Sequence, residues 1–455
     1  MARRSRADSR PTDRRRLLAA SLSAVVPGLG QALNGRVRPT AAFLLPSALV
    51  LGIAWLIVNA DRPAMVLARL IAPPILGLLL LLNVVVLVFR AMSVFQAFTD
   101  HRYPGRPGRL GAVGLVVVLA VVALPHVAVW TYGSATERLF ANVFSGSPVS
   151  AADPSVAPTG PGTTERLNVL LIGVDSAPGR TEALTDSMIV VSLDPVGRSV
   201  SMVSIPRDLA SVPLASGDVF GPKINSLVGW ADRHPKDFPG GGIHTLEGAI
   251  GALLGIPIHA YATVDLTGFV AMVDAVGGVD IDVKKALSDP IYPRLDGTRG
   301  WSVEPGLHHF DGTDALAYAR IRKALGENDL TRAARQQEVL VALRNRAVST
   351  GILLSLPSLL DGVGATVRTD LPLDRLPELA AMAEQIGSGS MTKLVLGAPF
   401  IKSAGETRYG SVFVPVPGKI AAMTKVVFGP PGSPVVWPPA PTPSGGPSSS
   451  ASGGD

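Results

Sequence analysis

Three long apolar runs in the first third of the chain limit its possible folds more than any other feature. They cover residues 40–60, 70–89 and 110–132, and they contain no Asp, Glu, Lys or Arg. A helix needs roughly 20 apolar residues to cross a bilayer, and all three runs reach that length. Because the runs follow one another, a cleaved signal peptide explains them poorly. The sequence therefore predicts three transmembrane helices.

The distribution of arginines predicts how these helices are oriented. Arginines crowd the first forty residues, and Arg90, Arg102, Arg106 and Arg109 lie between the second and third runs. Basic residues next to membrane helices favour the cytoplasmic side, so we expect a multi-pass protein of the cell membrane whose chain beyond residue 133 is extracytoplasmic. Residues 17–33, interrupted by Pro27-Gly-Leu-Gly30, leave one alternative open. An interfacial or re-entrant hairpin there keeps this orientation, whereas a full crossing reverses it.

The remaining chain reads as one sizeable domain between two low-complexity segments. Residues 133–166 and the tail from residue 429 are rich in Ser, Pro, Ala and Gly, which predicts a flexible linker and a disordered end. Between them, β-branched strands alternate with helices, which favours an α/β fold, a layered α-β-α domain with a central mixed sheet. The predicted parts are a basic cytoplasmic N-terminus (1–39), a membrane region (40–132), the linker (133–166), the extracytoplasmic domain (167–428, motif core 167–343) and the tail (429–455).

Two aspartates lie at the ends of predicted strands. Asp175 follows a buried-type strand, and Asp186 begins the next strand after a loop. Two close carboxylates either share a proton or bind a cation. The plainer interpretation is that Asp186 caps a turn and Asp175 solvates a loop, and these two residues alone favour it. The chain has no cysteine, which excludes disulfides, thiolate catalysis and zinc–thiolate sites.

The basic residues strengthen the case for a ligand site. Arg320 and Arg322 alternate with apolar residues, so a strand there would place both on one face. The planar guanidinium group donates hydrogen bonds in pairs and keeps its charge, which suits phosphate. The other candidates are Arg207 with Asp208 at a strand end, Lys223 with Asn225, and the trio Arg332, Arg335 and Gln336 at helical spacing. Taken together with the two aspartates, they predict a site for a magnesium-bound pyrophosphate.

The order of these motifs resembles the LytR-CpsA-Psr family of cell-wall glycopolymer ligases. The resemblance runs from about residue 167 to residue 343. The segments that carry it are Asn168-Val-Leu-Leu-Ile-Gly-Val-Asp175, Thr185-Asp186-Ser, Ser204-Ile-Pro-Arg207-Asp208, Lys223-Ile-Asn225, Val276-Gly-Gly-Val-Asp280, Tyr318-Ala-Arg320-Ile-Arg322 and Arg332-Ala-Ala-Arg335-Gln336-Gln337.

The resemblance implies an enzyme that transfers a glycopolymer from a polyprenyl-pyrophosphate carrier to a peptidoglycan sugar hydroxyl. It implies that Asp175 and Asp186 hold Mg²⁺ (or Mn²⁺). The expected catalytic residues are Arg207, Asp208, Arg320 and Arg322, with Asp208 a candidate for the base but favoured as the partner that orients Arg207. The implied phosphate-binding residues are Arg207, Lys223, Asn225, Arg320, Arg322, Arg332, Arg335 and Gln336. The implied partners are the lipid-linked polymer, peptidoglycan and the membrane.

Two other functions fit the same residues. Water in place of the sugar hydroxyl would make the protein a phosphatase of the lipid pyrophosphate. A domain that binds the ligand without reaction would make it a regulator that binds wall or lipid. A nucleic-acid partner is not expected for a domain outside the cell.

Overall fold

The structure is a computed structural model, and it describes residues 10–59, 73–103, 105–143, 165–175, 184–322, 324, 326–349, 367–371, 379, 386 and 390–435. The chain divides into two units, each considered by itself. The first comprises residues 1–146 and 350–384, and the second comprises residues 147–349 and 385–455.

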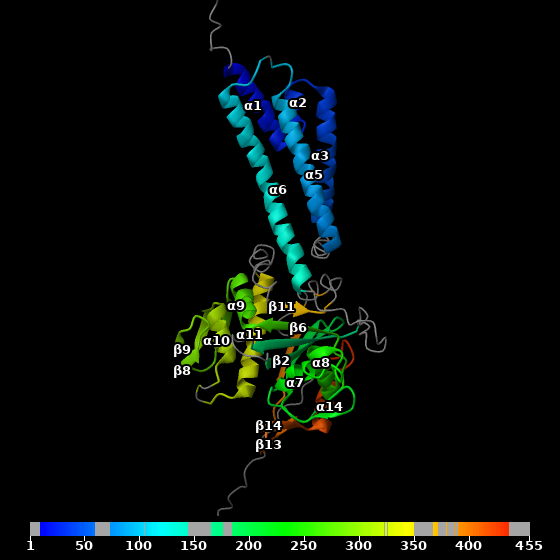
Figure 1. Cartoon of the computed structure of the whole chain (residues 1–455), viewed down its shortest axis with the longest axis vertical. Coiled ribbons are helices and arrows are strands. Elements are labelled where there is room, and N and C mark those ends of the chain that lie inside the picture. Colours follow the sequence, from blue (N-terminus) through cyan, green and yellow to red (C-terminus); the bar gives the residue numbers. More distant parts are fainter. Residues whose placement is uncertain are drawn as a thin grey trace, which may run out of the picture. The chain divides into compact units, whose positions relative to one another are not determined.

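The first unit contains a bundle of long apolar helices (Figure 1). Its elements are α1 (Arg10–Val25), α2 (Leu29–Leu33), α3 (Val37–Val58), α5 (Pro73–Phe98), α6 (Arg109–Val143) and the short strand β11 (Val367–Thr369). Helices α3, α5 and α6 are each long and apolar enough to cross a membrane. The prediction of three such helices is confirmed, and they indicate that the protein is anchored in a membrane.

Helices α1 and α2 form a hairpin that packs against α5 and α6. This hairpin includes residues 17–33, for which the sequence left open both a re-entrant hairpin and a full crossing. At one end of the hairpin, the backbone N–H of Gly108 donates to Asp13 at 3.0 Å. At the other end, Arg36 forms an ion pair of 3.1 Å with Asp100. Gly108 and Asp100 both belong to the connection between α5 and α6, so the hairpin begins and ends beside the same loop.

Helix α6 extends beyond the third apolar run. It continues to Val143, so residues 133–143 of the expected linker are helical. Its last turns contain Ala135, Glu137, Arg138 and Leu139, all good helix formers, and the long apolar helix before them removes the cost of nucleation. Residues 144–164 of the expected linker and residues 436–455 of the expected tail lie outside the described residues.

The second unit is built on a mixed sheet whose strands run in the order β6-β1-β2-β3-β12. These strands are β6 (Ala260–Asp265), β1 (Leu167–Asp175), β2 (Leu184–Asp194), β3 (Ser199–Ser204) and β12 (Met391–Val395). The central three strands are antiparallel neighbours, whereas β6 pairs parallel with β1 and β12 pairs parallel with β3. The predicted mixed α/β fold is confirmed.

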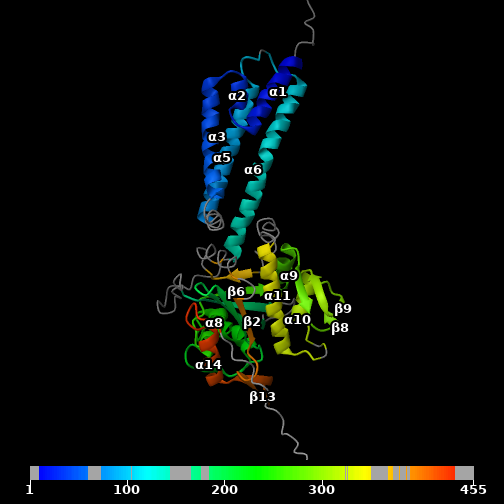
Figure 2. The ribbon, with the colours of Figure 1, turned by 180° about the vertical axis from the view of Figure 1, so that it is seen from behind.

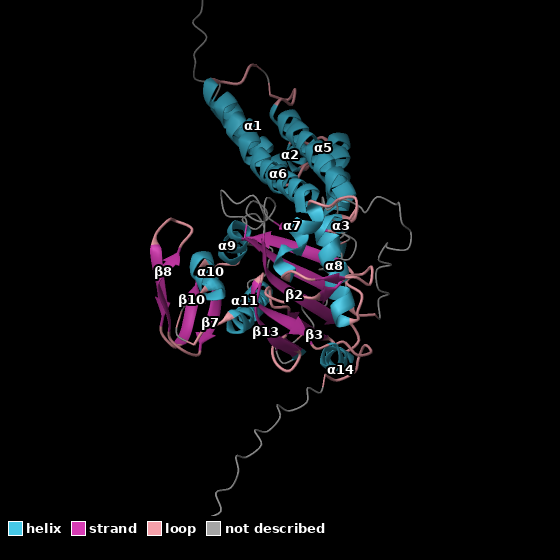
Figure 3. Cartoon of the chain, turned by 60° about the horizontal axis from the view of Figure 1, so that its bottom comes forward, coloured by secondary structure: helices cyan, strands magenta, loops and turns pink. Residues whose placement is uncertain are grey.

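Helices cover both faces of this sheet. Helices α7 (Leu227–Asp232), α8 (Gly241–Leu254) and α14 (Pro417–Val427) lie on one face, and α11 (Asp329–Ser349) lies on the other, as Figures 2 and 3 show. The first face is apolar, with Leu170 and Val190 buried against Leu246 and Ile250 of α8. The face toward α11 is partly polar, because Gln337 donates to the hydroxyl of Ser204 at 2.8 Å.

A second apolar core lies beside the main sheet. It combines α9 (Leu266–Ala275), α10 (Gly312–Arg320) and α11 with the strand pair β7 (Val279–Val283) and β10 (Gly306–Phe310) and the hairpin of β8 (Leu287–Pro293) and β9 (Arg299–Val303). Trp301 and Phe310 are buried in it. The smaller elements of the unit are β4 (Val212–Pro213), β5 (Val219–Phe220), η1 (Ile224–Ser226), β13 (Ile401–Thr407) and β14 (Gly410–Pro415).

Candidate active site

A pocket of about 330 Å³ lies where the main sheet meets the second core. Its volume suits a ligand headgroup rather than a polymer. Seven of the eleven predicted site residues line it. The described lining residues are Asp175, Asp186, Arg207, Asp289, Ile291, Tyr292, Pro293, Arg320, Ile321, Arg322, Arg332 and Gln336.

The two aspartates reach the pocket from neighbouring antiparallel strands. Asp175 is the last residue of β1, and Asp186 lies near the start of β2. The register pairs Gly173 with Ser187 and Val174 with Thr185, so Asp186 is an extra residue in a β-bulge. A bulge turns a side chain away from the regular alternation, and here it allows both carboxylates to face one cavity.

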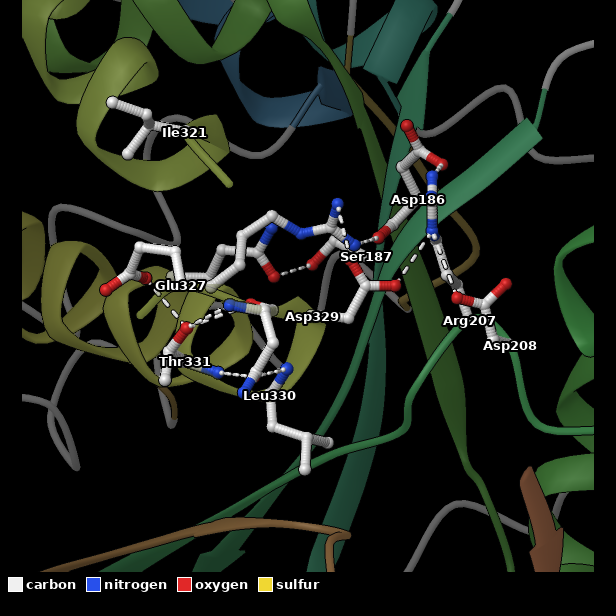
Figure 4. A network of polar contacts seen from close by, with 12 residues as sticks. Asp186, Ser187, Arg207, Asp208, Ile321, Glu327, Asp329, Leu330 and Thr331 are labelled. Carbon is white, nitrogen blue, oxygen red and sulfur yellow. Dashed lines mark hydrogen bonds and ion pairs between the residues drawn. The ribbon is translucent and has the colours of Figure 1, made fainter. Parts of the chain in front are cut away.

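A chain of ion pairs holds the phosphate-binding candidates in place (Figure 4). The guanidinium of Arg207 donates to Asp186 at 2.7 Å and to Asp329 at 3.3 Å. Asp329, the first residue of α11, also pairs with Arg332 one turn later at 3.3 Å. Arg332 in turn donates to the backbone carbonyl of Asp186 at 3.4 Å. Asp329 therefore orients two arginines from different elements toward one pocket.

The charges in this chain perturb one another. Burial alone would lower the pKa of Arg207, but the carboxylates of Asp186, Asp329 and Asp208 outweigh burial and raise this pKa. Burial lowers the pKa of Arg332, and the nearby cations Arg207 and Arg322 lower it further. Arginine remains charged in either case. An anion placed between these guanidinium groups would relieve their mutual repulsion, which favours a phosphate-type ligand.

Arg320 and Arg322 reach the pocket from a helix end instead of a strand. The expected strand is absent because Gly312–Arg320 forms α10, with the Asp311 side chain accepting from the backbone N–H of Asp314 as its N-cap. Alanine and leucine in that segment favour the helix. Arg320 forms an ion pair of 3.2 Å with Asp175. Arg322, two residues beyond Arg320, lines the pocket while remaining exposed.

Gln336 lines the pocket from the next turn of α11. Its side-chain oxygen accepts from the Ser187 hydroxyl at 2.9 Å, and its amide nitrogen donates to the carbonyl of Ala319 at 3.4 Å. These contacts tie α11 to β2 and to α10. Gln336 therefore connects the strand that carries Asp186 with the helix that carries Arg320.

Three predicted residues stand behind the pocket wall. Lys223 donates to Asp208 at 2.6 Å, and Asp208 lies 3.9 Å from Arg207. Burial and a hydrogen bond with Asp329 raise the pKa of Asp208, although Lys223 opposes the shift. The backbone of Asn225 donates to the carbonyl of Arg207 at 3.3 Å. Asp208, Lys223 and Asn225 are not among the described lining residues.

Arg335 points away from the pocket. It donates to the carbonyl of Tyr318 at 2.5 Å, to the carbonyl of Ile321, and to Glu327 at 2.8 Å. Its guanidinium also lies 5.5 Å from the centre of the Tyr318 ring. The structure therefore places Arg335 at the end of α10, where it satisfies helix carbonyls, and not among the described residues that line the pocket.

Sequence reasoning missed two parts of the site. The first is Asp329, although its position three residues before Arg332 on a helix was a usable signal. The second is the wall formed by Asp289, Ile291, Tyr292 and Pro293 of β8. Nothing local marks this wall, because only the packing of the β8–β9 hairpin brings it to the pocket.

The two aspartates fit a hard divalent cation. Carboxylate oxygens are the protein ligands that Mg²⁺ prefers, and phosphate and water oxygens usually complete its shell. Asp175 and Asp186 offer carboxylates from adjacent strands to one cavity, with no nitrogen or sulfur donor required. Each is ion-paired with an arginine, so a bound cation would share these carboxylates with Arg320 and Arg207.

Comparison with known proteins identifies the family of this chain. A profile of the LytR_cpsA_psr family matches residues 137–419, which is more than half of the chain. The chain belongs to the LytR_cpsA_psr family. The resemblance recognised in the sequence is therefore confirmed.

Relatives within the family are named as cell-wall proteins. The polyisoprenyl-teichoic acid–peptidoglycan teichoic acid transferase TagU of Halalkalibacterium halodurans is 33% identical over 213 residues, which cover 47% of this chain and 63% of TagU. TagV of Bacillus subtilis, named for the same activity, is 33% identical over 50% of this chain and 54% of its own length. The cell wall biosynthesis protein LcpA of Corynebacterium glutamicum is 30% identical over 51% of this chain and 46% of its own length. This chain thus spans only about half to two-thirds of these relatives.

Solved structures of the family also match. The crystal structure of B. subtilis TagV is 25% identical, with a TM-score of 0.46, and covers 58% of this chain and 98% of that one. The structure of TagT bound to LI-WTA is 24% identical, with a TM-score of 0.45, and covers 59% of this chain and 92% of that one.

Proposed function

We propose that this protein transfers a glycopolymer from a polyprenyl-pyrophosphate carrier to a sugar hydroxyl of peptidoglycan. The observation that carries the proposal is the convergence of Arg207, Arg320, Arg322 and Arg332 on one pocket that also contains two aspartates. A pyrophosphate supplies the negative charge that these guanidinium groups need between them. The names of the relatives TagU and TagV support the same substrates.

The reaction requires positioning and neutralisation of charge more than a protein nucleophile. The acceptor hydroxyl attacks the phosphorus next to the sugar of the polymer, and the carrier leaves as polyprenyl phosphate. Arg320, the last residue of α10, and Arg322, two residues later, bind one side of the diphosphate, and Arg207 and Arg332 bind the other. Removal of one such donor typically slows catalysis on the order of 10²-fold.

Asp175 and Asp186 would hold Mg²⁺ or Mn²⁺. Such an ion, when bound, supplies positive charge to the phosphate oxygens. The ion pairs of these carboxylates with Arg320 and Arg207 orient them before a ligand arrives.

The proposal also includes a location. We infer that α3, α5 and α6 anchor the protein in the cell membrane and that the second unit faces the cell exterior. The carrier lipid stays in the bilayer, so an anchored enzyme meets it at a high effective concentration. Peptidoglycan lies on the same outer side.

The test supplies purified full-length protein with a labelled polyprenyl-pyrophosphate-linked glycan, with and without peptidoglycan fragments. Transfer of label to the fragments is the expected result. Release of phosphorylated glycan at the same rate without fragments would instead identify a phosphatase. Binding without any turnover would identify a non-catalytic binder.

The metal requirement is tested in the same assay. We expect treatment with a chelator to abolish transfer and added Mg²⁺ or Mn²⁺ to restore it, whereas added Ca²⁺ tests for selectivity. Unchanged transfer in excess chelator would contradict the assignment of Asp175 and Asp186 as metal ligands.

A further inference from the structure

The wall of the pocket formed by β8 has no role in the reaction described so far. Asp289, Ile291, Tyr292 and Pro293 all line the pocket from this strand. The register between β8 and β9 is irregular from Asp289 to Pro293, which is the stretch that faces the cavity. An irregular strand re-aims side chains that regular alternation would turn away, so β8 is shaped to present this wall to a ligand.

The β8–β9 hairpin that carries this wall is anchored to the helix that carries the arginines. Trp301 of β9 is the partner of Asp289 in the register, and its indole N–H donates to Asp314 of α10 at 3.1 Å. Arg294 forms an ion pair of 3.3 Å with the same aspartate. The β8 wall is thus attached to α10, whose last residue is Arg320.

Three carboxylates are among the described residues that line the pocket, and two of them form ion pairs with arginines. Asp175 is paired with Arg320 and Asp186 with Arg207. In each of these ion pairs a guanidinium N–H already occupies a carboxylate oxygen. These two are also the proposed metal ligands. Neither carboxylate is therefore suited to remove a proton from the acceptor.

Asp289 has a different environment. It is 6% exposed, and one of its oxygens accepts the backbone N–H of Ile291 at 3.1 Å. Among the described residues, no arginine or lysine forms an ion pair with it. This hydrogen bond holds one carboxylate oxygen, and no hydrogen bond from a described residue occupies the other, while the residue itself lines the pocket. Asp208 differs, because it lies behind the wall and is bound to Lys223.

The neighbouring side chains complete a surface suited to a sugar. Tyr292 is 6% exposed, and burial raises the pKa of its hydroxyl, although the adjacent Arg320 opposes this shift. Its hydroxyl therefore stays protonated and neutral at physiological pH. Ile291 and Pro293 flank it with apolar surface. A carbohydrate presents both hydroxyls and apolar C–H faces, and this wall offers groups that match both.

We propose that β8 forms the acceptor subsite and that Asp289 is the general base that activates the acceptor hydroxyl. This inference rests on the proposed function. As the acceptor oxygen forms its bond to phosphorus, its proton moves to the unbound oxygen of Asp289. The bond from phosphorus to the bridging oxygen breaks, and polyprenyl phosphate leaves with that electron pair. Asp289 then releases the proton to solvent.

The test compares Asp289→Asn with wild type in the full-length protein. Asparagine has the same shape and can still accept from Ile291, but it cannot take a proton. We expect the maximal rate of donor consumption to fall by about 10²- to 10⁴-fold. Binding of the lipid-linked donor is expected to change less than about threefold, because the arginines are untouched. Asp282→Asn, at an exposed position of β7, is the matched control and is expected to keep the wild-type rate.

The outcomes separate this inference from the proposed function. If wild type hydrolyses its donor without transfer, the proposed function fails, yet Asp289→Asn must still slow donor consumption if Asp289 is the base. A rate within about threefold of wild type overturns the role of Asp289. So does an effect confined to the KM for the acceptor, which would indicate binding alone.

A second variant covers a failure of Asp289→Asn to fold. Asp289→Glu keeps a carboxylate at a shifted position, and thermal unfolding reports whether each variant is folded. We expect Asp289→Glu to consume donor at least tenfold faster than Asp289→Asn, or faster than background where the latter is unfolded. A folded Asp289→Glu variant with no more than background activity would contradict the inference.

Discussion

Single residues of one motif have different tasks in this site. Arg332 and Arg335 lie three residues apart on α11, yet Arg332 lines the pocket and Arg335 binds the end of α10. The difference follows from the helix itself, because residues three apart are separated by about 60° around the axis. Spacing predicted a shared face, and the surrounding elements determine what each guanidinium contacts.

Replacement of Arg335 with methionine should therefore reduce stability first. Glu327, whose side chain is fully buried, would lose one of its cationic partners, and two helix carbonyls would lose their donor. We expect the free energy of unfolding to fall by about 3 kcal/mol, measured by chemical denaturation. Donor affinity of the folded fraction should stay near wild type. A folded, fully stable variant with weakened donor binding would support a direct phosphate contact instead.

Arg207 is expected to be sensitive even to lysine. Its planar group donates to Asp186 and Asp329 at the same time, which a single ammonium on a flexible chain does poorly. We expect Arg207→Lys to lower the transfer rate on the order of 10²-fold. Arg299→Lys, at an exposed position of β9, is the control and should have no effect. Equal rates for both variants would show that the paired geometry at Arg207 is unimportant.

At the scale of elements, the site depends on how α10 begins. The N-cap Asp311 accepts from the backbone N–H of Asp314 at 2.8 Å, and this bond lowers the pKa of Asp311. The other end of the same helix carries Arg320 into the pocket. A local capping interaction thus supports an arginine about two and a half turns away.

Asp311→Ala should reduce stability in a way that depends on pH. Loss of an N-cap costs about 1 kcal/mol at neutral pH. Because the pKa of Asp311 is lower in the folded state, its stabilisation is present above the unfolded pKa near 3.9 and disappears as the pH falls through the folded value. In denaturation curves, the difference in the free energy of unfolding between Asp311→Ala and wild type should be smaller at pH 3 than at pH 7. An equal difference at both pH values would contradict the interpretation that Asp311 caps the helix in its ionised form.

At the scale of the whole molecule, the α1–α2 hairpin bears on the predicted orientation. It begins beside Gly108 and ends beside Asp100, in the same loop. A segment with both ends at one side of the bundle does not add a crossing. We therefore expect the re-entrant or interfacial alternative, with three crossings in total.

The absence of native cysteine makes this expectation simple to test. Single cysteines replace the exposed residues Arg14, Arg106 and Ser433. A membrane-impermeant maleimide should label Ser433→Cys in intact cells, and Arg14→Cys and Arg106→Cys only after permeabilisation. A full crossing by residues 17–33 would instead place positions 14 and 106 on opposite sides.

Much of this protein can be predicted from sequence because the relevant signals are local. Apolar runs identify α3, α5 and α6, since length and hydropathy are properties of consecutive residues. Alternating β-branched segments identify β1 and β2, and motif order identifies the family. The prediction of a strand around Arg320 was wrong, because tertiary packing and the N-cap of α10 favour a helix there.

By itself, the sequence determined the membrane helices, the layered α/β domain and the set of charged residues that we propose bind phosphate. Only the tertiary structure decided which of these residues share a pocket. Arg207 meets Asp329 across 122 positions, and Arg320 meets Asp175 across 145. Contacts at such separations depend on how whole elements pack. No local sequence pattern therefore shows that Arg335 points away from the pocket or that Asp289 lines it.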